Sequence, residues 1–392
     1  MENVTMTDWP DTRRRARDML DAFIPHAGAE YARNRGMDLG PGSHRHVSRL
    51  SPALRHRLVT ERECIAAALD AHGQQAAKFV DEVFWRSYFK GWLEQRPQVW
   101  TDARPTTLPD DRTLDAMRGR TGIDCFDAWV RELVATGYLH NHARMWFASI
   151  WIFTLRLDWR LGADFFLRHL LDGDAASNTL SWRWVAGLHS QGKSYRADPD
   201  NIARFTDGRF RPTGLASEAP PLSEGAPPPR IPLPRPAPPL PEMPAGLLIT
   251  AEDCRPEDHA WPCPISGAAT LAGSHLRSSE PVAPMVRAFE EAALADAARR
   301  HGGQVTALHA GDPQVLVDWA ADIGVRQIVT PYVPAGPMRD WLDDAAPTLD
   351  RAGIVLRQMR RDWDDLVWPH ATAGYFKLKK NIPRILQAAD LG

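Results

Sequence analysis

The spacing of apolar residues divides the chain into two kinds of structure. Over residues 10–38, 60–96 and 122–170, apolar side chains recur three and four positions apart, which is typical of amphipathic helices. The pattern predicts one or two helices in the first of these segments, a strongly helical second segment and three helices in the third. Residues 97–120 predict a loop with a short helix near 111–118.

The pattern changes after residue 245. Short apolar runs predict buried strands at 246–250, 305–308, 327–329 and 354–356. Amphipathic stretches between them predict helices at 284–301, 313–322 and 337–350. Alternation of strands and helices is typical of a small α/β domain with a largely parallel sheet.

A proline-rich segment separates the two regions. Residues 213–245 contain PPLSEGAPPPRIPLPRPAPPLP, a composition that favours an extended chain and a linker. We therefore predict a helical domain at 1–212, a linker at 213–245 and an α/β domain at 246–392. A length of 392 residues is consistent with two domains.

Composition narrows the functional classes. A net charge of −2 argues against a protein that coats a polyanion, although a local basic groove remains possible. Four scattered cysteines without a CxxC motif indicate a reducing compartment, and no stretch approaches 18 apolar residues, so we expect a cytoplasmic protein. Cys254, His259 and Cys263 are close in sequence, but their irregular spacing favours a surface loop over a metal site. Fifteen tryptophans are more than core packing needs and suggest stacking or electron transfer.

Three short segments carry candidate chemistry. The loop GPGSHRHVSRLSP offers hydroxyls and Arg49, and we expect Ser51 and Pro52 to open the next helix as N-cap and first-turn residue. These groups together suit a phosphate. Glu82 and Arg86 are four residues apart on a predicted helix, where the ordinary interpretation is a surface ion pair. The turn Asp172-Gly173-Asp174 places two carboxylates together. They are candidates for a metal site, for helix caps, or for acceptors of a heterocycle's N–H groups.

Read together, these segments resemble the FAD-binding domain of the DNA photolyase and cryptochrome family over roughly residues 30–210. The resemblance rests on SRLSP at 48–52, EVFWRSYF at 82–89, TGIDCFDAWVRELVATGYLHNHARM at 121–145, LDWR at 157–160 and DGDAASNTLSWRW at 172–184. It implies a mainly α fold, in which an all-helical photolyase-type FAD-binding domain is followed by a small Rossmann-like α/β domain.

The resemblance also implies a flavin site. The residues expected to bind FAD are Tyr31, Ser48, Arg49, Leu50, Ser51, Arg86, Arg144, Asp172, Gly173, Asp174 and Asn178. Arg144 and Asp172 would pair beside the flavin, Asp174 would accept from its pyrimidine edge, and Asn178 would face its N5 side. Trp182 and Trp159 match two members of the family's electron-transfer chain. The third, surface member is not evident, since only Trp100 lies near the expected position.

A substrate cavity is implied as well. Its expected contacts are Glu82, Trp85, Asn141, His142, Met145 and Trp184. Trp85 and Trp184 would clamp a flipped-out pyrimidine dimer. Glu82, Asn141 and Asn178 are the candidate catalytic residues. Asn141 and Met145 resemble the branch that repairs cyclobutane dimers, whereas His142 departs from the family's usual arginine.

The order of the regions departs from the family, whose α/β domain usually precedes the FAD-binding domain and often carries an antenna chromophore. Residues 246–392 resemble part of that domain, displaced to the C-terminus, with fewer strands than usual, and no antenna follows from the sequence. Two hypotheses remain. One is light-driven repair of damaged DNA, and the other is a cryptochrome-like photoreceptor with a protein partner. Basic patches at 230–235 and 377–380 are surface or linker in the simpler interpretation.

Overall fold

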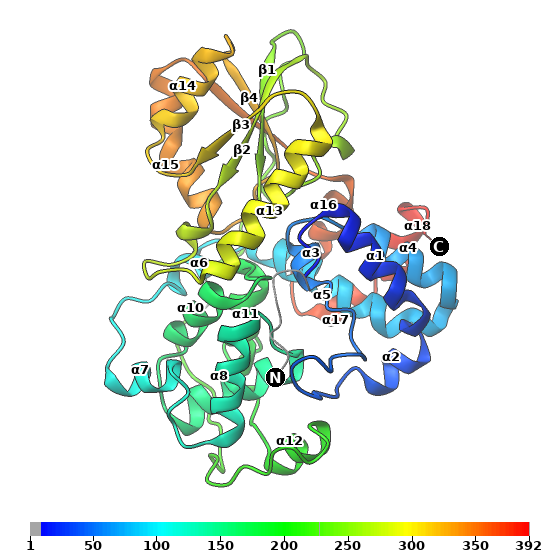
Figure 1. Ribbon diagram of the computed structural model, residues 1–392, viewed down its shortest axis with the longest axis vertical. Helices are drawn as coiled ribbons and strands as arrows, with labels where there is room; N and C mark the ends of the chain where they lie inside the picture. The colour runs from blue at the N-terminus through cyan, green and yellow to red at the C-terminus, as the bar shows by residue number, and fades with distance from the viewer. Residues whose placement is uncertain (1–8, 227, 392) are drawn as a thin grey trace.

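A computed structural model describes residues 9–226 and 228–391 and shows a helical region beneath an α/β region (Figure 1). Residues 1–8, 227 and 392, which belong to the predicted domains and linker, lie outside the described parts. The helices of the first region are α1 (Arg13–Phe23), α2 (Ala29–Asn34), α3 (Ser51–Arg55), α4 (Glu61–His72), α5 (Ala77–Glu94), α6 (Gln98–Asp102), α7 (Asp111–Met117), α8 (Asp124–Thr136), α9 (Asn141–Ser149), α10 (Trp159–His169), α11 (Ala175–Val185) and α12 (Pro199–Phe205). The predicted three helices in 122–170 are therefore confirmed as α8, α9 and α10.

Side-chain caps fix where several of these helices begin. Thr60 and Glu63 form a capping box at α4, in which each side chain bonds the other residue's backbone N–H. Asp158 and Asp174 cap α10 and α11 in the same sense, by accepting from N–H groups of the first turn. Between α9 and α10 the chain passes through a π-turn, Ile150–Thr154. The Asp174 cap thus fixes where the Asp172–Asp174 turn ends and α11 begins.

The α/β region contains a five-stranded, all-parallel sheet. Its strands are β1 (Ala245–Thr250), β2 (Ile265–Ala272), β3 (Val305–His309), β4 (Gln327–Pro331) and β5 (Val355–Met359), in the order β3-β2-β1-β4-β5. Four of these five strands were predicted, whereas β2 was not. β2 reads ISGAATLA, whose small residues give little apolar signal on their own. At Gly267 a side chain would meet Ile323, which explains why a small residue lies there.

Helices cover both faces of the sheet (Figure 1). On one face, α13 (Pro284–His301) packs Val286 and Phe289 into the same apolar cluster as Leu247 and Ile249 of β1. On the other face, α14 (Gln314–Asp322) and α15 (Pro337–Arg351) pack against Leu248 and Ile328. Alternate β1 residues thus enter two different clusters, because successive side chains of a strand point to opposite faces.

The chain returns to the helical region after β5. α16 (Asp362–Val367), α17 (Tyr375–Lys379) and α18 (Ile382–Ala388) follow the sheet. The Trp363 indole N–H donates to Ser87 Oγ of α5 at 2.9 Å, and the Tyr375 hydroxyl donates to the Asp81 carbonyl at 2.9 Å. The division into two domains at 213–245 stays a prediction, but residues 361–391 lie against α5 rather than against the sheet.

Buried ion pairs join the two regions. Both oxygens of Asp364 accept from the Arg57 guanidinium, at 2.7 and 2.8 Å, and Asp253 lies 3.3 Å from the same group. Asp253 in turn accepts from Arg361 at 2.6 and 2.8 Å. Buried charges of this kind are tolerated when they are paired and hydrogen-bonded, so the contact between the regions is specific.

No helix in the described parts of the chain is long and apolar enough to cross a membrane.

Candidate functional site

The turn between α10 and α11 holds both carboxylates of the candidate site. Asp174 Oδ1 accepts from the Ser177 backbone N–H at 2.7 Å and caps α11. The helix-cap alternative for Asp174 is therefore confirmed. Asn178, one turn further along α11, donates from Nδ2 to the Ala163 carbonyl at 2.8 Å. Asp174 is thus oriented by α11 itself, and Asn178 by its bond to α10.

Three cations surround the other oxygen of Asp174. Arg55, Arg86 and Lys90 place a nitrogen 3.9, 3.8 and 3.6 Å from Asp174 Oδ2. Burial alone would raise the Asp174 pKa, but attraction to Lys90, Arg86 and Arg55 outweighs it and holds that pKa well below its ordinary value. The aspartate is therefore ionised, and the three cations exceed its charge.

Arg144 and Asp172 form the pair that the resemblance implies. Arg144 Nη1 lies 3.0 Å from Asp172 Oδ2, and Arg144 Nε donates to the Leu139 carbonyl at 2.9 Å. Burial raises the Asp172 pKa, but the nearby Arg144 and Arg86 guanidinium groups lower it overall. Arg144 lies on α9 and Asp172 on the turn, so the pair joins two segments that α10 separates in the chain.

Buried donors in this neighbourhood lack acceptors. Arg49 Nε, Arg86 Nη1 and Lys90 Nζ have no hydrogen-bond partner among the described residues. Unpaired buried donors are costly, so this donor set fits a ligand rich in acceptors, such as phosphates or the carbonyls of a flavin. FAD carries both kinds of acceptor, and the residues present therefore fit it.

The loop GPGSHRHVSRLSP, which was expected to suit a phosphate, differs from its prediction in one detail. Leu50 holds the N-cap position of α3 and makes no side-chain cap, while Ser51 is the first helical residue, so Ser51 is not the cap. Ser48 Oγ accepts from the Leu50 N–H at 3.4 Å. Arg49 has a positive φ of 55° and lies over the Trp9 ring, 4.5 Å from its centroid. Tyr31 is buried on α2 against Phe79, and burial raises its pKa.

The ion pair expected between Glu82 and Arg86 on the surface of α5 does not form. Glu82 accepts from Arg35 Nη1 at 2.7 Å, while Arg86 is directed to Asp174. Burial raises the Glu82 pKa, and the Arg35 charge opposes that shift only in part. The two members of the predicted pair thus belong to different parts of the site.

The expected substrate-side residues have aromatic neighbours that the sequence did not indicate. Trp85 stacks on Tyr375 of α17, with ring centroids 3.8 Å apart and an angle of 12°. Trp184 stacks on Tyr195 at 5.6 Å. Tyr375 lies 290 positions from Trp85 in the chain, and no local pattern could have connected them.

The polar residues on this side are less enclosed. Asn141 is exposed, and its amide lies 3.9 Å from Met145 Sδ. His142 donates from Nδ1 to the Gly36 carbonyl at 2.7 Å, and burial lowers its pKa. The imidazole is thus held by the protein in a neutral form.

The tryptophans divide by environment. Trp146 and Trp151 are fully buried, as expected for packing. Trp182 is buried between Phe166 and Trp151, with ring centroids at 5.2 and 6.2 Å. Trp100 is buried and donates to Asp340 of α15 at 2.8 Å, so it lies in the contact between the helical region and the α/β region. Trp100 therefore does not supply the surface member of the chain.

Trp159 has a partner from the proline-rich segment. Its indole N–H donates to Glu224 Oε1 at 2.9 Å. The segment is extended, as predicted, but it lies on the helical region through backbone bonds such as Leu222 N–H to the Ala186 carbonyl and Ile231 N–H to the Gln95 carbonyl. Sequence reasoning treated these residues as a spacer and missed Glu224.

The cysteine-containing segment is a loop with exposed residues such as Glu257 and Asp258, as expected. Cys254, His259 and Cys263 are all buried, and Cys254 Sγ contacts the Thr250 carbonyl. Within the described residues, the acidic and histidine side chains close enough for a metal are Asp38, His44 and Glu132. His44 Nε2 already contacts Glu132 at 2.8 Å, and Arg209 pairs with Asp38 at 3.1 Å. Both carboxylates of the cluster are therefore already paired, while His44 Nδ1 has no partner among the described residues.

Comparison with known proteins agrees with this geometry. Residues 79–207 match the family described as the FAD binding domain of DNA photolyase. That defines the class of the helical region as an FAD-binding domain.

Two curated relatives extend the match. A deoxyribodipyrimidine photo-lyase of Streptomyces griseus is 40% identical over 146 residues, covering 36% of this chain and 32% of that protein. The deoxyribodipyrimidine photo-lyase of Escherichia coli is 30% identical over 203 residues, covering 48% and 42%. A class III photolyase structure from Agrobacterium tumefaciens is 30% identical, covers 50% of this chain and 43% of that protein, and has a TM-score of 0.44.

Residues 79–207 of this chain are therefore similar to the FAD-binding domain of DNA photolyases. The chain spans less than half of the length of these relatives.

Proposed function

We propose that the protein binds FAD and uses blue light to repair cyclobutane pyrimidine dimers in DNA, by electron transfer from reduced flavin to a flipped-out dimer. The observation that carries the proposal is the buried cluster around Asp172 and Asp174, whose cationic donors outnumber their protein acceptors. Residues of this kind fit the phosphates and ring carbonyls of a flavin. FAD, when bound, supplies the light absorption and the redox chemistry.

In this proposal, the chain's own residues bind the flavin and orient it. Arg144 and Asp172 hold each other beside the flavin, and Asp174, fixed as a helix cap, accepts from its pyrimidine edge. Asn178 faces the N5 side. The buried ionic surroundings strengthen each of these interactions, since fewer waters compete with them.

The substrate side is expected to hold a dimer between Trp85 and Trp184. Each ring already has one face covered, by Tyr375 and Tyr195, which fixes its orientation and leaves the other face for a base. Glu82, with its raised pKa, is suited to share a proton with a dimer that has gained negative charge. Beside Trp85, α17 presents Phe376, 74% exposed, and the exposed Lys377, which suit contact with a DNA strand.

A repair assay tests the proposal. Purified protein with bound FAD is illuminated together with an oligonucleotide that contains a thymine dimer, and the return of thymine absorbance is followed. We expect recovery only in light and only with reduced flavin. A Trp184→Ala variant should retain FAD and lose affinity for the damaged oligonucleotide. Normal affinity in that variant would refute the clamp.

A second candidate is a cryptochrome-like photoreceptor that binds FAD and signals to a protein partner. Two observations favour it. His142 is bonded to Gly36 rather than free for a DNA phosphate. The Asp172–Asp174 turn and the residues before it are hydrogen-bonded to the α/β region. Arg277 donates to the Leu170 carbonyl at 3.0 Å, and Arg55 bonds both Gly173 and Glu252. Efficient photoreduction without thymine recovery would select this alternative. An antenna chromophore remains unassigned in either case.

A further inference from the structure

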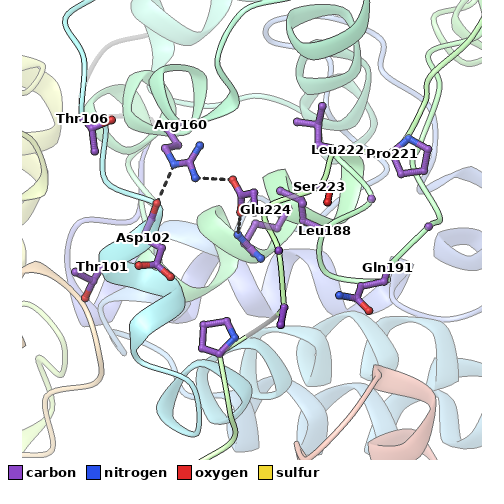
Figure 2. A pocket seen from close by; sticks show the side chains of 16 residues that line it. Thr101, Asp102, Thr106, Arg160, Leu188, Gln191, Pro221, Leu222, Ser223 and Glu224 are labelled. Atoms are coloured by element: carbon purple, nitrogen blue, oxygen red, sulfur yellow. Dashed lines mark hydrogen bonds and ion pairs between the residues drawn. The ribbon is translucent and has the colours of Figure 1, made fainter.

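Glu224 binds Trp159 and the two arginines beside its ring. Its carboxylate accepts from the Trp159 indole N–H at 2.9 Å, from Arg160 Nη2 at 2.5 Å and from Arg183 Nη1 at 2.6 Å. Both guanidinium groups also lie over the Trp159 ring, 5.1 and 5.7 Å from its centroid. Figure 2 shows Arg160 between Asp102 and Glu224, with its hydrogen bonds to both.

Trp151, Trp159 and Trp182 belong to the same apolar cluster. Among these three, only Trp159 has a base in contact with its indole nitrogen. The Trp182 indole N–H has no acceptor within the described structure. The Trp151 indole N–H donates to the Asp158 backbone carbonyl at 2.8 Å, and an amide oxygen is a poor proton acceptor. Trp182 can therefore pass an electron but has no group to receive its proton, whereas Trp159 has a carboxylate in hydrogen-bond contact.

We propose that Glu224 is the proton acceptor of Trp159 when light oxidises that tryptophan. The step rests on the proposed flavin function, in which excited oxidised FAD takes one electron from Trp159 through Trp182. Loss of the electron leaves a tryptophan radical cation with an acidic N–H. The N–H bond breaks, its electron pair stays on nitrogen, and the proton moves to the Glu224 carboxylate. The products are a neutral tryptophan radical and a neutral glutamic acid.

The two arginines act on both partners of this transfer. They oppose positive charge on Trp159, which is relieved once the proton leaves, and they also stabilise the ionised form of Glu224, so the acidity of the tryptophan radical cation has to drive the transfer. Glu224 is 23% exposed and lines a cavity of about 710 Å³, with Gln191 and Ser223, through which the proton can reach water. A neutral radical cannot recover its electron without also recovering a proton. Proton loss therefore prolongs the separated charge, and a chain of two tryptophans can end at Trp159.

The segment that carries Glu224 gives a second consequence. Residues 213–245 were predicted to act as a spacer, yet the Glu224 contacts attach them to α10 and α11 at the end of the tryptophan path. Neutralising Glu224 weakens its bonds to Arg160 and Arg183, so we expect light to loosen this attachment.

Transient absorption on the FAD-loaded protein tests the proposal, because the protonated and neutral tryptophan radicals have different spectra. We expect Glu224→Gln to retain FAD and to form the radical, but to lose the proton roughly 10²-fold more slowly, as for loss of a positioned general base. Glu224→Asp should restore part of the rate. Glu218→Gln, an exposed carboxylate of the same segment, is the matched control and should behave as wild type. An unchanged rate in Glu224→Gln would overturn the proposal.

Two further measurements separate the possible failures. If Trp159→Phe leaves the tryptophan radical unchanged, the electron path is wrong and Glu224 has no such role, although FAD binding and repair stand. If Glu224→Gln fails to hold FAD, the wild-type rate is measured at increasing buffer concentration. Transfer to Glu224 predicts a rate that does not depend on buffer, and a rate that rises with buffer concentration would show loss to solvent and overturn the proposal.

Discussion

The flavin side and the substrate side of the candidate site are built in different ways. On the flavin side, Asp174 and Asp172 are buried, and their partners Arg55, Arg86, Lys90 and Arg144 are held by ion pairs. On the substrate side, Trp85 and Trp184 are half-buried and depend on stacking with Tyr375 and Tyr195. Charges inside a protein tolerate little change, whereas stacked rings at a surface can be altered singly. We therefore expect flavin binding and DNA binding to be separable by mutation.

The largest effect is expected at Asp174. Asp174→Ala leaves Arg86 and Lys90 without their carboxylate, while Arg55 keeps Glu252, and loss of a buried partner costs about 3–5 kcal/mol of the free energy of unfolding. We expect loss of bound FAD and a marked fall in Tm, measured by flavin absorbance and thermal unfolding. Asp115→Ala, an exposed carboxylate on α7, should change neither. An Asp174→Ala protein with full flavin content would contradict the assignment of this cluster.

The corresponding change on the substrate side is Trp85→Ala. Stacking of a base on an aromatic side chain contributes about 1–3 kcal/mol, so affinity for dimer-containing DNA should fall up to about a hundred-fold. FAD content should stay at the wild-type level. Titration of a labelled oligonucleotide measures the affinity, and an undamaged oligonucleotide serves as control. Simultaneous loss of FAD and DNA binding would show that the two sides are not separable.

Acid should destabilise the contact that holds the C-terminal segment. His189 lies 3.0 Å from the Tyr88 hydroxyl, which donates to the Ala373 carbonyl. Burial, with the nearby Arg183 and Arg96, lowers the His189 pKa to about 4. The unfolded chain binds this proton near pH 6.5, before the folded protein does, so stability is full above pH 6.5 and is lost as the pH falls towards 4.

Between pH 7 and pH 5 the loss from His189 is about 2 kcal/mol in the free energy of unfolding. Urea unfolding at the two pH values measures it. His189→Gln should remove that part of the pH dependence, while other buried histidines such as His140 keep theirs. An unchanged difference between the two pH values in this variant would show that His189 is accessible to protons in the folded state.

The smallest effect is expected at Lys379. Its ammonium lies 2.5 Å from Asp81 Oδ2, but the side chain is 41% exposed. Water and salt screen such pairs, so Lys379→Ala should lower the free energy of unfolding by less than about 1 kcal/mol. Lys377→Ala, which has no such ion pair, is the control within the same helix. A larger effect would mean that α17 depends on this ion pair more than on the Tyr375 stack.

The residues expected on the flavin side came from the family resemblance, and four of them are close in the chain. Arg144, Asp172, Asp174 and Asn178 lie within 35 positions, on helices whose periodicity and caps are evident in the chain. Helical spacing fixes which of them share a face, and a capping aspartate fixes where α11 begins. The pairing of Arg144 with Asp172 was expected from a family resemblance, and their distance of 3.0 Å agrees with it.

Tertiary structure decided what local patterns cannot encode. Arg86 was expected to pair with Glu82 four residues away, yet it is directed to Asp174, since a cation gains more beside a buried carboxylate than in a surface pair. β2 was missed because its small residues become a strand only between β1 and β3. Trp85 stacks on Tyr375, and Trp159 bonds Glu224, only because the fold brings distant segments back to α5 and α10. Sequence thus determined which helices form and where the buried charges lie, and folding decided which residues complete the site.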